Sequence, residues 1–238
     1  MAQKGIGIYA AADAGWASHL KDIFHNSGIG KTAYAIVELD LVGRVKNFVQ
    51  SIPSGDSSPP IGEVHFQEKR LRYQNHAEKL DGSARLPNLI QNGDTIHIVW
   101  IGHASYYSSG KKEAATYRSA KFLPNMNKAE DHLMSAKELA RCIKAVCEAG
   151  GGTQYPASLC IYSCHSFDAR QKIANSGTIL SVSSNPLAVQ VATKLKAMYD
   201  PLPATTCTVY GLTEAMMGIK IRSSTCAPTG NGYQSQVV

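Results

Sequence analysis

The sequence predicts an α/β fold in which a largely parallel sheet is flanked by helices. Three apolar patterns typical of buried strands, at 94–103, 158–164 and 205–212, alternate with two helical patterns, at 135–150 and 185–200. This order predicts parallel neighbouring strands, because each helix returns the chain across the sheet before the next strand begins. The runs "DTIHIVWIGH" and "SLCIYSC" are almost continuously apolar, which indicates strands buried on both faces.

Both helical patterns carry signals for their amino-terminal ends. In "SAKELARCIKAVCEAG", Ser135 and Glu138 match a capping box, and apolar residues recur at helical spacing behind them. In "NPLAVQVATKLKAMYD", Asn185 is the expected cap and Pro186 is the expected first-turn residue. Gly150 follows the first helical pattern and is expected to end that helix.

The amino-terminal part of the chain predicts a helix and two strands. "DAGWASHLKDIFHNSG" places Trp16, Leu20, Ile23 and Phe24 on one face of a helix. Farther along, β-prone runs predict strands and a stretch rich in Pro, Gly and Ser predicts a loop. The two strands are expected at 32–41 and 63–73, and the loop at 51–62.

We expect one domain over residues 1–238, because this length suits one generous domain and no repeat or long low-complexity segment appears. The helix and strands of 1–93 would precede a strand–helix core over 94–212. A further strand and a flexible tail would occupy 213–238.

The composition argues against several classes of protein. The net charge is +6 and the pI about 8.9, but no dense Lys/Arg run appears, so a nucleic-acid partner is not expected. No apolar stretch approaches the roughly 20 residues that span a membrane, and the amino terminus lacks a secretory pattern. We therefore expect a cytoplasmic protein, or one exported into a host cell without a classical signal peptide. The six cysteines fall mostly within predicted elements, which indicates reduced thiols.

Two reactive side chains stand at the ends of neighbouring predicted strands. His103 follows the first buried strand and Cys164 follows the second, and ligands of parallel sheets bind beyond the carboxyl ends of the strands. A thiol with a pKa of about 8.5 needs a base to become an efficient nucleophile, and histidine is the usual one. His165 is disfavoured as that base, because adjacent residues of an extended segment point to opposite sides. The pair predicts a Cys164–His103 dyad.

Different roles for Cys164 are less consistent with the sequence. No histidine follows residue 165, which excludes the papain-like order of Cys before His. The alternating helices disagree with an all-β chymotrypsin-like peptidase. A zinc site is not expected, because Cys160 and Cys164 would lie about 14 Å apart on an extended strand. A buried structural thiol beside a hydrogen-bonded histidine remains the plain alternative.

The segments "IVWIGHAS" and "LCIYSCHS" resemble the two signature blocks of the caspase-like (clan CD) cysteine peptidases. "SCHS" is similar to the metacaspase cysteine block. "GHAS", followed by the Ser-x-x-Glu-Leu helix, resembles the inositol-phosphate-activated cysteine protease domains of bacterial toxins. The resemblance covers 94–212 and implies a caspase-like fold. It also implies that Cys164 is the nucleophile, that His103 is the base and acid, and that backbone N–H groups of Cys164 and of Gly102 or Ala104 hold the oxyanion.

The chain also departs from these families. Ala104 replaces the glycine that follows the histidine, and Phe167 replaces the glycine that follows "SCHS". Tyr162 stands where metacaspases have Asp and caspases have Gln, so neither a basic nor an acidic specificity is implied. Candidate substrate-binding residues are Tyr162, Ser163, Ser183 and Glu214.

The resemblance implies a cysteine endopeptidase that acts on protein or peptide substrates through an acyl-enzyme. It also allows autoprocessing and a role as a bacterial effector or toxin. A catalytically inactive caspase-like scaffold and another cysteine acyl-transfer enzyme are the alternatives. No metal or cofactor is required. The toxin resemblance allows a polyanionic activator such as inositol hexakisphosphate, with Lys69, Arg70, Arg72, Lys111 and Lys112 as candidate ligands.

The segment 104–133 is too long for an ordinary connection. Two interpretations are open for it: a substrate or activation loop beside the dyad, or a solvated surface insertion.

Overall fold

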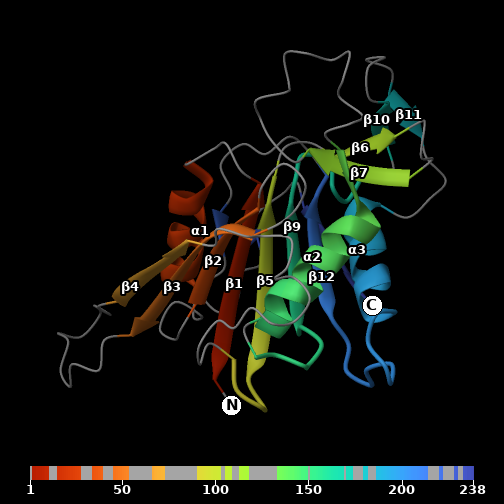
Figure 1. The fold of residues 1–238 in the computed structure, drawn as a ribbon. Coiled ribbons are helices and arrows are strands. Elements are labelled where there is room, and N and C mark those ends of the chain that lie inside the picture. Colours follow the sequence, from red (N-terminus) through yellow and green to blue (C-terminus); the bar gives the residue numbers. More distant parts are fainter. Residues whose placement is uncertain are drawn as a thin grey trace.

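An eight-stranded sheet forms the centre of the computed structural model (Figure 1). Its five middle strands, β2, β1, β5, β9 and β12, run parallel, and antiparallel strands flank them on both sides. From one edge to the other the strands are β15 (Tyr233–Val237), β12 (Thr208–Leu212), β9 (Ser158–Tyr162), β5 (Thr95–Ile101), β1 (Gln3–Ala10), β2 (Tyr34–Leu39), β3 (Val45–Pro53) and β4 (Phe66–Arg72).

The structure describes most of the sheet and its helices. The described residues are 2–10, 15–27, 34–39, 45–53, 66–72, 90–102, 105–108, 113–117, 133–149, 151–168, 170–173, 179–181, 186–213, 220–221, 228–229 and 233–238.

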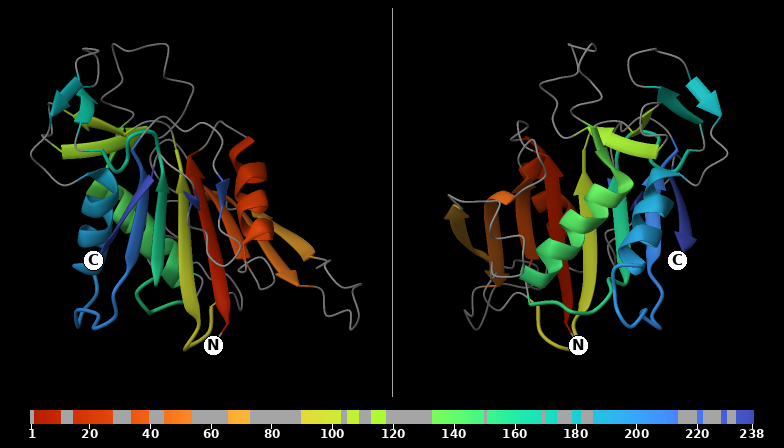
Figure 2. Two further views of the ribbon diagram at one scale, coloured as in Figure 1. Left: turned by 180° about the vertical axis from the view of Figure 1, so that it is seen from behind. Right: turned by 45° about the vertical axis from the view of Figure 1, so that its right-hand side comes forward.

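Helices cover both faces of the sheet, as the sequence predicts. α2 (Ala136–Ala149) and α3 (Leu187–Lys196) lie on one face, and α1 (Gly15–Asn26) lies on the other, which is best seen from behind in Figure 2. The α/β class and the largely parallel sheet with flanking helices are therefore confirmed. Within the described ranges, none of the helices is both long enough and apolar enough to cross a membrane.

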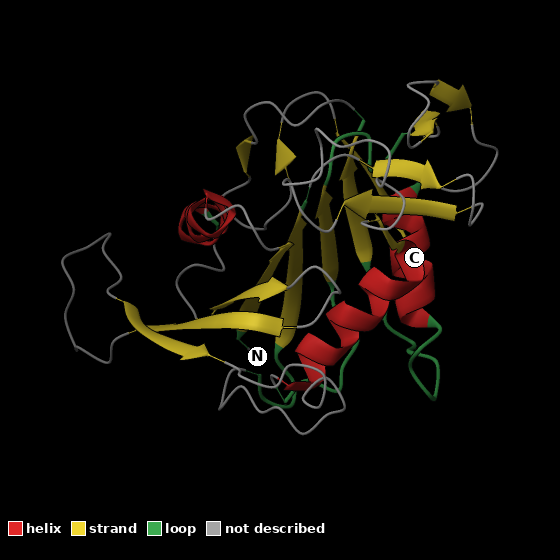
Figure 3. Cartoon of the chain, turned by 45° about the horizontal axis from the view of Figure 1, so that its top comes forward, coloured by secondary structure: helices red, strands yellow, loops and turns green. Residues whose placement is uncertain are grey.

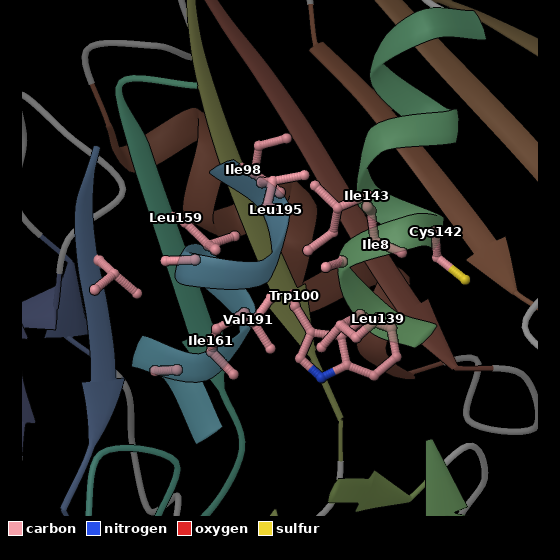
Figure 4. Close-up of a cluster of buried hydrophobic side chains, with 14 of the residues drawn as sticks. Ile8, Ile98, Trp100, Leu139, Cys142, Ile143, Leu159, Ile161, Val191 and Leu195 are labelled. Atoms are coloured by element: carbon pink, nitrogen blue, oxygen red, sulfur yellow. The ribbon is translucent and has the colours of Figure 1, made fainter. Parts of the chain in front are cut away.

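Alternate residues of β5 pack into different cores. Ile98 and Trp100 belong to the cluster beneath α2 and α3, which Figure 4 shows, whereas Val99 and Ile101 belong to the cluster beneath α1. A strand that is buried on both faces must be apolar at every position. This explains why β5 is apolar at almost every position and confirms the prediction of a strand buried on both faces.

The predicted capping box of α2 forms. The Ser135 backbone N–H donates to Glu138 Oε2 at 2.8 Å, and the Glu138 N–H donates to Ser135 Oγ at 3.2 Å. For α3, the cap position is Pro186 rather than Asn185, and no side chain of the described residues caps the helix. Asn185 and Gly150 lie outside the described residues.

Several expectations about the amino-terminal part need correction. β1 lies at the centre of the sheet, between β2 and β5, yet no strand is predicted there. β3 is also additional, and it includes residues 51–53 of the predicted loop. The helix and the strands predicted at 32–41 and 63–73 are present as α1, β2 and β4, with Leu20, Ile23 and Phe24 buried on one face of α1.

Described parts of the segment 104–133 belong to a second sheet. Its strands, in order, are β11 (Ile179–Ser181), β10 (Arg170–Ile173), β6 (Ser105–Ser108), β7 (Glu113–Tyr117) and β8 (Leu133–Ser135). Figure 3 shows this sheet beyond the ends of the central strands, beside α2 and α3. Part of the segment is therefore regular structure at the carboxyl edge of the main sheet.

The predicted flexible tail is also regular in part. β15 pairs with β12 along its whole length, from Thr208↔Val237 to Leu212↔Tyr233. A short ladder of β13 (Lys220–Ile221) and β14 (Pro228–Thr229) precedes it. The polar sequence of β15 suits an edge strand, because only one of its backbone sides needs a partner and its side chains can face water.

Candidate active site

Cys164 lies in a tight turn just after β9. We call residues 163–168 the Cys164 turn. Four of the five described cysteines are buried, and Cys164 is the half-buried exception. Burial raises the pKa values of the Cys147 and Cys207 thiols to about 12, so both stay protonated at neutral pH and cannot act as nucleophiles. Cys164 is therefore the accessible thiol of the described chain.

The ends of β5 and β9 are tied together beside this turn. Ile101 pairs with Tyr162 in the parallel ladder. Beyond that pair, the Gly102 N–H donates to the Tyr162 carbonyl at 3.1 Å, and Ser163 Oγ donates to the Gly102 carbonyl at 3.2 Å. The chain thus leaves both strands in register, and one hydroxyl joins the two departing segments.

Ser166 binds the Cys164 turn to two strands. Its hydroxyl donates to the Ile161 carbonyl of β9 at 2.6 Å and accepts from the Leu212 N–H of β12 at 3.0 Å. The next residue continues the attachment, since the Phe167 N–H donates to the Leu212 carbonyl at 2.8 Å. Ser166 is fully buried, so these bonds are shielded from competition by water.

Gly211 allows the turn to approach β12. A Cβ atom at this position would lie 2.9 Å from Ser166 Oγ and 3.1 Å from the Phe167 Cβ. The sequence pattern does not identify Ser166 or Gly211, because their roles depend on contacts across as many as 46 residues of chain. The sequence offers one indirect signal for these roles: it predicts strands at 158–164 and 205–212, and neighbouring strands would bring Gly211 close to the residues that follow Cys164.

His165 adopts an unusual backbone conformation. Its φ is +59°, a left-handed value that non-glycine residues seldom adopt. The prediction that Cys164 and His165 point to opposite sides assumed an extended segment. That premise is wrong, because residues 164–167 form a turn. The His165 side chain reaches beyond the turn, since its Nδ1 lies 3.1 Å from the Thr213 carbonyl oxygen.

The candidate substrate-binding residues divide into two groups. Tyr162 is fully buried in the cluster beneath α1, and Ser163 is fully buried at the strand ends. A substrate side chain would reach Tyr162 only if the atoms that cover it moved. The role of both residues in substrate binding stays a prediction. The remaining predicted site residues lie outside the described residues: His103, Ala104, Ser183 and Glu214.

In the sequence, His103 lies between β5 and β6, and Cys164 lies between β9 and β10. β5 and β9 lead into β6 and β10, which also pair in parallel, with Tyr106 opposite Lys172. His103 is two residues beyond Ile101 in the sequence, and Cys164 is two residues beyond its ladder partner Tyr162. No three His, Cys, Asp or Glu side chains of the described chain are grouped to hold a metal ion.

Gly102 and Trp100 pack against each other at the end of β5. A Cβ atom at Gly102 would lie 2.8 Å from Trp100 Cζ2, and the indole is fully buried. We expect Gly102→Ala to lower the free energy of unfolding by about 1–3 kcal/mol, because the buried ring would have to shift to admit the added methyl group. Denaturant unfolding measures this change.

Trp100→Phe provides a matched background for that measurement. Trp100 Nε1 has no hydrogen-bond partner within the described part of the chain, so the exchange removes no known hydrogen bond and shortens the ring that faces Gly102. Gly102→Ala should cost less in this background, with a coupling of about 0.5–3 kcal/mol. An equal cost in both backgrounds would show that the indole is not the obstacle.

Neither a protein-family model nor a curated protein matches the sequence. The distantly similar solved structures include two C11 proteases. One is an inactive zymogen of a C11 protease from Parabacteroides distasonis, with a TM-score of 0.43, 12% identity, and coverage of 92% of this chain and 51% of that chain. The other is a secreted C11 cysteine protease from Bacteroides thetaiotaomicron, "iotapain", with a TM-score of 0.40, 12% identity, and coverage of 90% and 54%. The chain therefore spans about half the length of each C11 protease.

Proposed function

We propose that the protein is a cysteine endopeptidase in which Cys164 is the nucleophile and His103 is its general base. The observation that carries this proposal is the register at the carboxyl edge of the sheet. Ile101 and Tyr162 are ladder partners, and the histidine and the cysteine each follow two residues later on adjacent strands. Among the five cysteines that the structure describes, Cys164 alone is accessible, which supports the same assignment.

The proposed reaction begins when the imidazole of His103 takes the proton of the Cys164 thiol. The thiolate attacks the scissile carbonyl carbon, and backbone N–H groups stabilise the oxyanion that forms. His103 then gives its proton to the departing amine, which leaves Cys164 as a thioester. Water, deprotonated by the same imidazole, hydrolyses the thioester and regenerates the thiol. A positioned base of this kind contributes about 10²–10⁴-fold to the rate.

Labelling of Cys164 by a small acyl electrophile tests the dyad. We expect His103→Ala to slow labelling by about 10²-fold or more, because the thiol loses the base that activates it. His19→Ala is the matched control, since His19 is an exposed histidine on α1, and it should label at the wild-type rate. Equal labelling of the wild type and His103→Ala would refute the dyad.

Turnover of a peptide library separates peptidase from the alternatives. Cleavage that disappears in Cys164→Ala supports the endopeptidase. Labelling that depends on His103 without any peptide cleavage would indicate another cysteine acyl-transfer enzyme. Slow, base-independent labelling without cleavage would indicate an inactive scaffold. The cleaved sequences would also show which side chain the protein prefers.

A polyanionic activator belongs to the same proposal and is supported by the resemblance to the toxin domains. Three of its candidate ligands, Lys69, Arg70 and Arg72, are on β4, the edge strand five positions from β9 in the sheet. At about 4.8 Å per strand that is a separation of about 24 Å, so an activator bound there would act at a distance. The bacterial effector or toxin setting, in the cytoplasm or after export, rests on the resemblance alone.

Thermal melting with inositol hexakisphosphate tests the activator. A ligand at 100 times its Kd stabilises the native state by about 2.7 kcal/mol, which should raise the melting temperature measurably. Lys69→Ala with Arg70→Ala should abolish the rise, whereas Lys194→Ala on α3 should not. An unchanged melting temperature at saturating ligand would rule out activation by binding to this fold.

A further inference from the structure

We propose that His165 is a positioning residue of the Cys164 turn. Its imidazole ties the turn to the end of β12 and thereby determines where Cys164 stands relative to the end of β5. The consequence for catalysis rests on the proposed function of Cys164. The geometry that supports the tie is independent of that function.

The backbone of His165 shows that the turn is held in place. A φ of +59° is unfavourable for an L-residue, because Cβ crowds the following carbonyl oxygen. Such conformations persist only where the surrounding structure imposes them, and they gather at functional sites. Two backbone hydrogen bonds hold His165 in this conformation. The Ser166 N–H donates to the Ser163 carbonyl at 3.0 Å, and the Asp168 N–H donates to the His165 carbonyl at 3.1 Å.

The His165 side chain makes a contact far along the sequence. Nδ1 lies 3.1 Å from the Thr213 carbonyl, 48 residues away. A carbonyl oxygen can only accept, so Nδ1 carries a hydrogen and donates it, which leaves Nε2 as the acceptor nitrogen of the neutral ring. Asp168 Oδ2 lies 3.6 Å from the same Nδ1, and a carboxylate there favours this tautomer and orientation.

Three successive residues of the turn thus bind the end of β12. Phe167 and Ser166 bind Leu212 through buried bonds, and His165 binds the next residue, Thr213. His165 is the exposed member, with 45% of its side chain accessible, whereas Ser166 and Phe167 are buried. Loss of the imidazole should therefore leave the buried attachment intact and loosen the side of the turn next to Cys164.

Three substitutions separate the backbone from the side chain. His165→Gly tolerates a positive φ but has no donor. His165→Asn tolerates a positive φ, and its amide Nδ2 occupies the place of Nδ1, so it can donate to the Thr213 carbonyl. His165→Ala lacks both properties. The comparison of Gly with Asn therefore isolates the hydrogen bond, and the comparison of Gly with Ala isolates the strain.

The measurement is the rate at which a small acyl electrophile labels Cys164, with a melting curve for every variant. We expect His165→Gly to label about tenfold more slowly than wild type, because a small displacement of a reacting group has large kinetic effects. His165→Asn should recover most of that loss, to within about threefold of wild type. His165→Ala should be at least as slow as Gly and should melt at a lower temperature.

Ser135→Ala is the matched control for general destabilisation. It removes the α2 capping box, whose hydrogen bonds do not involve residues 163–168, and it should lower the melting temperature while Cys164 labels at the wild-type rate. Wild-type labelling of His165→Gly would overturn the proposal, and so would an Asn variant that labels no faster than Gly.

The experiments can refute the His103–Cys164 dyad and the positioning role of His165 independently. Repeating the Gly and Asn comparison in the His103→Ala background shows whether the tie acts on Cys164 without the base. An Asn-over-Gly advantage that persists there supports the positioning role even if the dyad is refuted. A dyad confirmed by His103→Ala, with equal rates for Gly, Asn and wild type at residue 165, would refute the positioning role alone.

Discussion

Replacing Ser166 with alanine is expected to lower the free energy of unfolding by about 2–4 kcal/mol. The Ser166 hydroxyl donates to the Ile161 carbonyl at 2.6 Å and accepts from the Leu212 N–H at 3.0 Å. Alanine cannot serve either group, and the site is fully buried. A buried N–H without an acceptor costs about 1–3 kcal/mol, and loss of the second hydrogen bond adds about 1 kcal/mol.

Urea unfolding of Ser166→Ala measures this loss. Thr193→Ala is the matched control, because Thr193 Oγ1 also donates to a backbone carbonyl, that of Val189 at 2.9 Å, but from an exposed position of α3. The control should change stability by no more than about 0.5 kcal/mol. A Ser166→Ala cost as small as that of the control would mean that the hydroxyl does not bridge β9 and β12.

Ser166 also links stability to the candidate chemistry, because it is two residues from Cys164 and holds the same turn. A stability loss in Ser166→Ala should therefore come with slower labelling of Cys164. His165→Gly, in contrast, should slow labelling with little change in stability. The two variants separate the buried attachment of the turn from its exposed one.

Patterns local in sequence predicted the middle of the fold well. β5 and β9 are apolar at almost every position because both of their faces are covered, and the Ser135–Glu138 capping box is complete within four residues. The apolar face of α1 follows from spacing alone. In each case the sequence itself contains the interaction or periodicity that determines the element.

β1 was not predictable in the same way. In "QKGIGIYA" the apolar residues alternate with glycines, and glycine inside a strand usually weakens it. The reason for Gly7 appears only in three dimensions, since a Cβ there would lie 2.9 Å from Leu20 Cδ2 of α1. The glycine allows the helix to pack closely on the sheet, which is a tertiary requirement.

The candidate site, too, has features that the sequence predicts and features that only tertiary contacts determine. Its location at the ends of β5 and β9 follows from the strand order, and the exposure of Cys164 agrees with it. The conformation of its turn does not follow from the sequence. The positive φ of His165 and the bonds from His165 and Ser166 to the end of β12 depend on contacts that span 48 and 46 residues.

The protein is expected to lose about 3 kcal/mol of stability between pH 6.5 and pH 4 because of His97. Burial lowers the pKa of His97 from 6.5 to about 4. Above pH 6.5 the imidazole is neutral in both the folded and the unfolded chain, so the full stability is present. As the pH falls, the unfolded chain takes up a proton that the folded chain refuses, and this favours unfolding until the folded pKa is reached.

The surroundings of His97 explain why the neutral ring is preferred. Its Nδ1 lies 2.7 Å from Ser158 Oγ, and its Nε2 contacts Gln3 Oε1. Since the amide oxygen can only accept, Nε2 carries the hydrogen and the Ser158 hydroxyl donates to Nδ1. Both ring nitrogens of the neutral form are satisfied in a site that is only 7% exposed, and no carboxylate among these partners offsets a positive charge.

His97→Gln tests this assignment when unfolding is measured at intervals from pH 7 to pH 4.5. The variant should be less stable at pH 7, but its stability should decline less on acidification than that of wild type, by about 2–3 kcal/mol over this range. His19→Gln removes an exposed histidine and should keep the wild-type slope. Identical slopes for wild type and His97→Gln would show that another group causes the acid sensitivity. His97 pairs with Ser158 at the start of β9, the opposite end from Cys164, so its protonation should lower the folded population without changing the labelling rate of the folded protein.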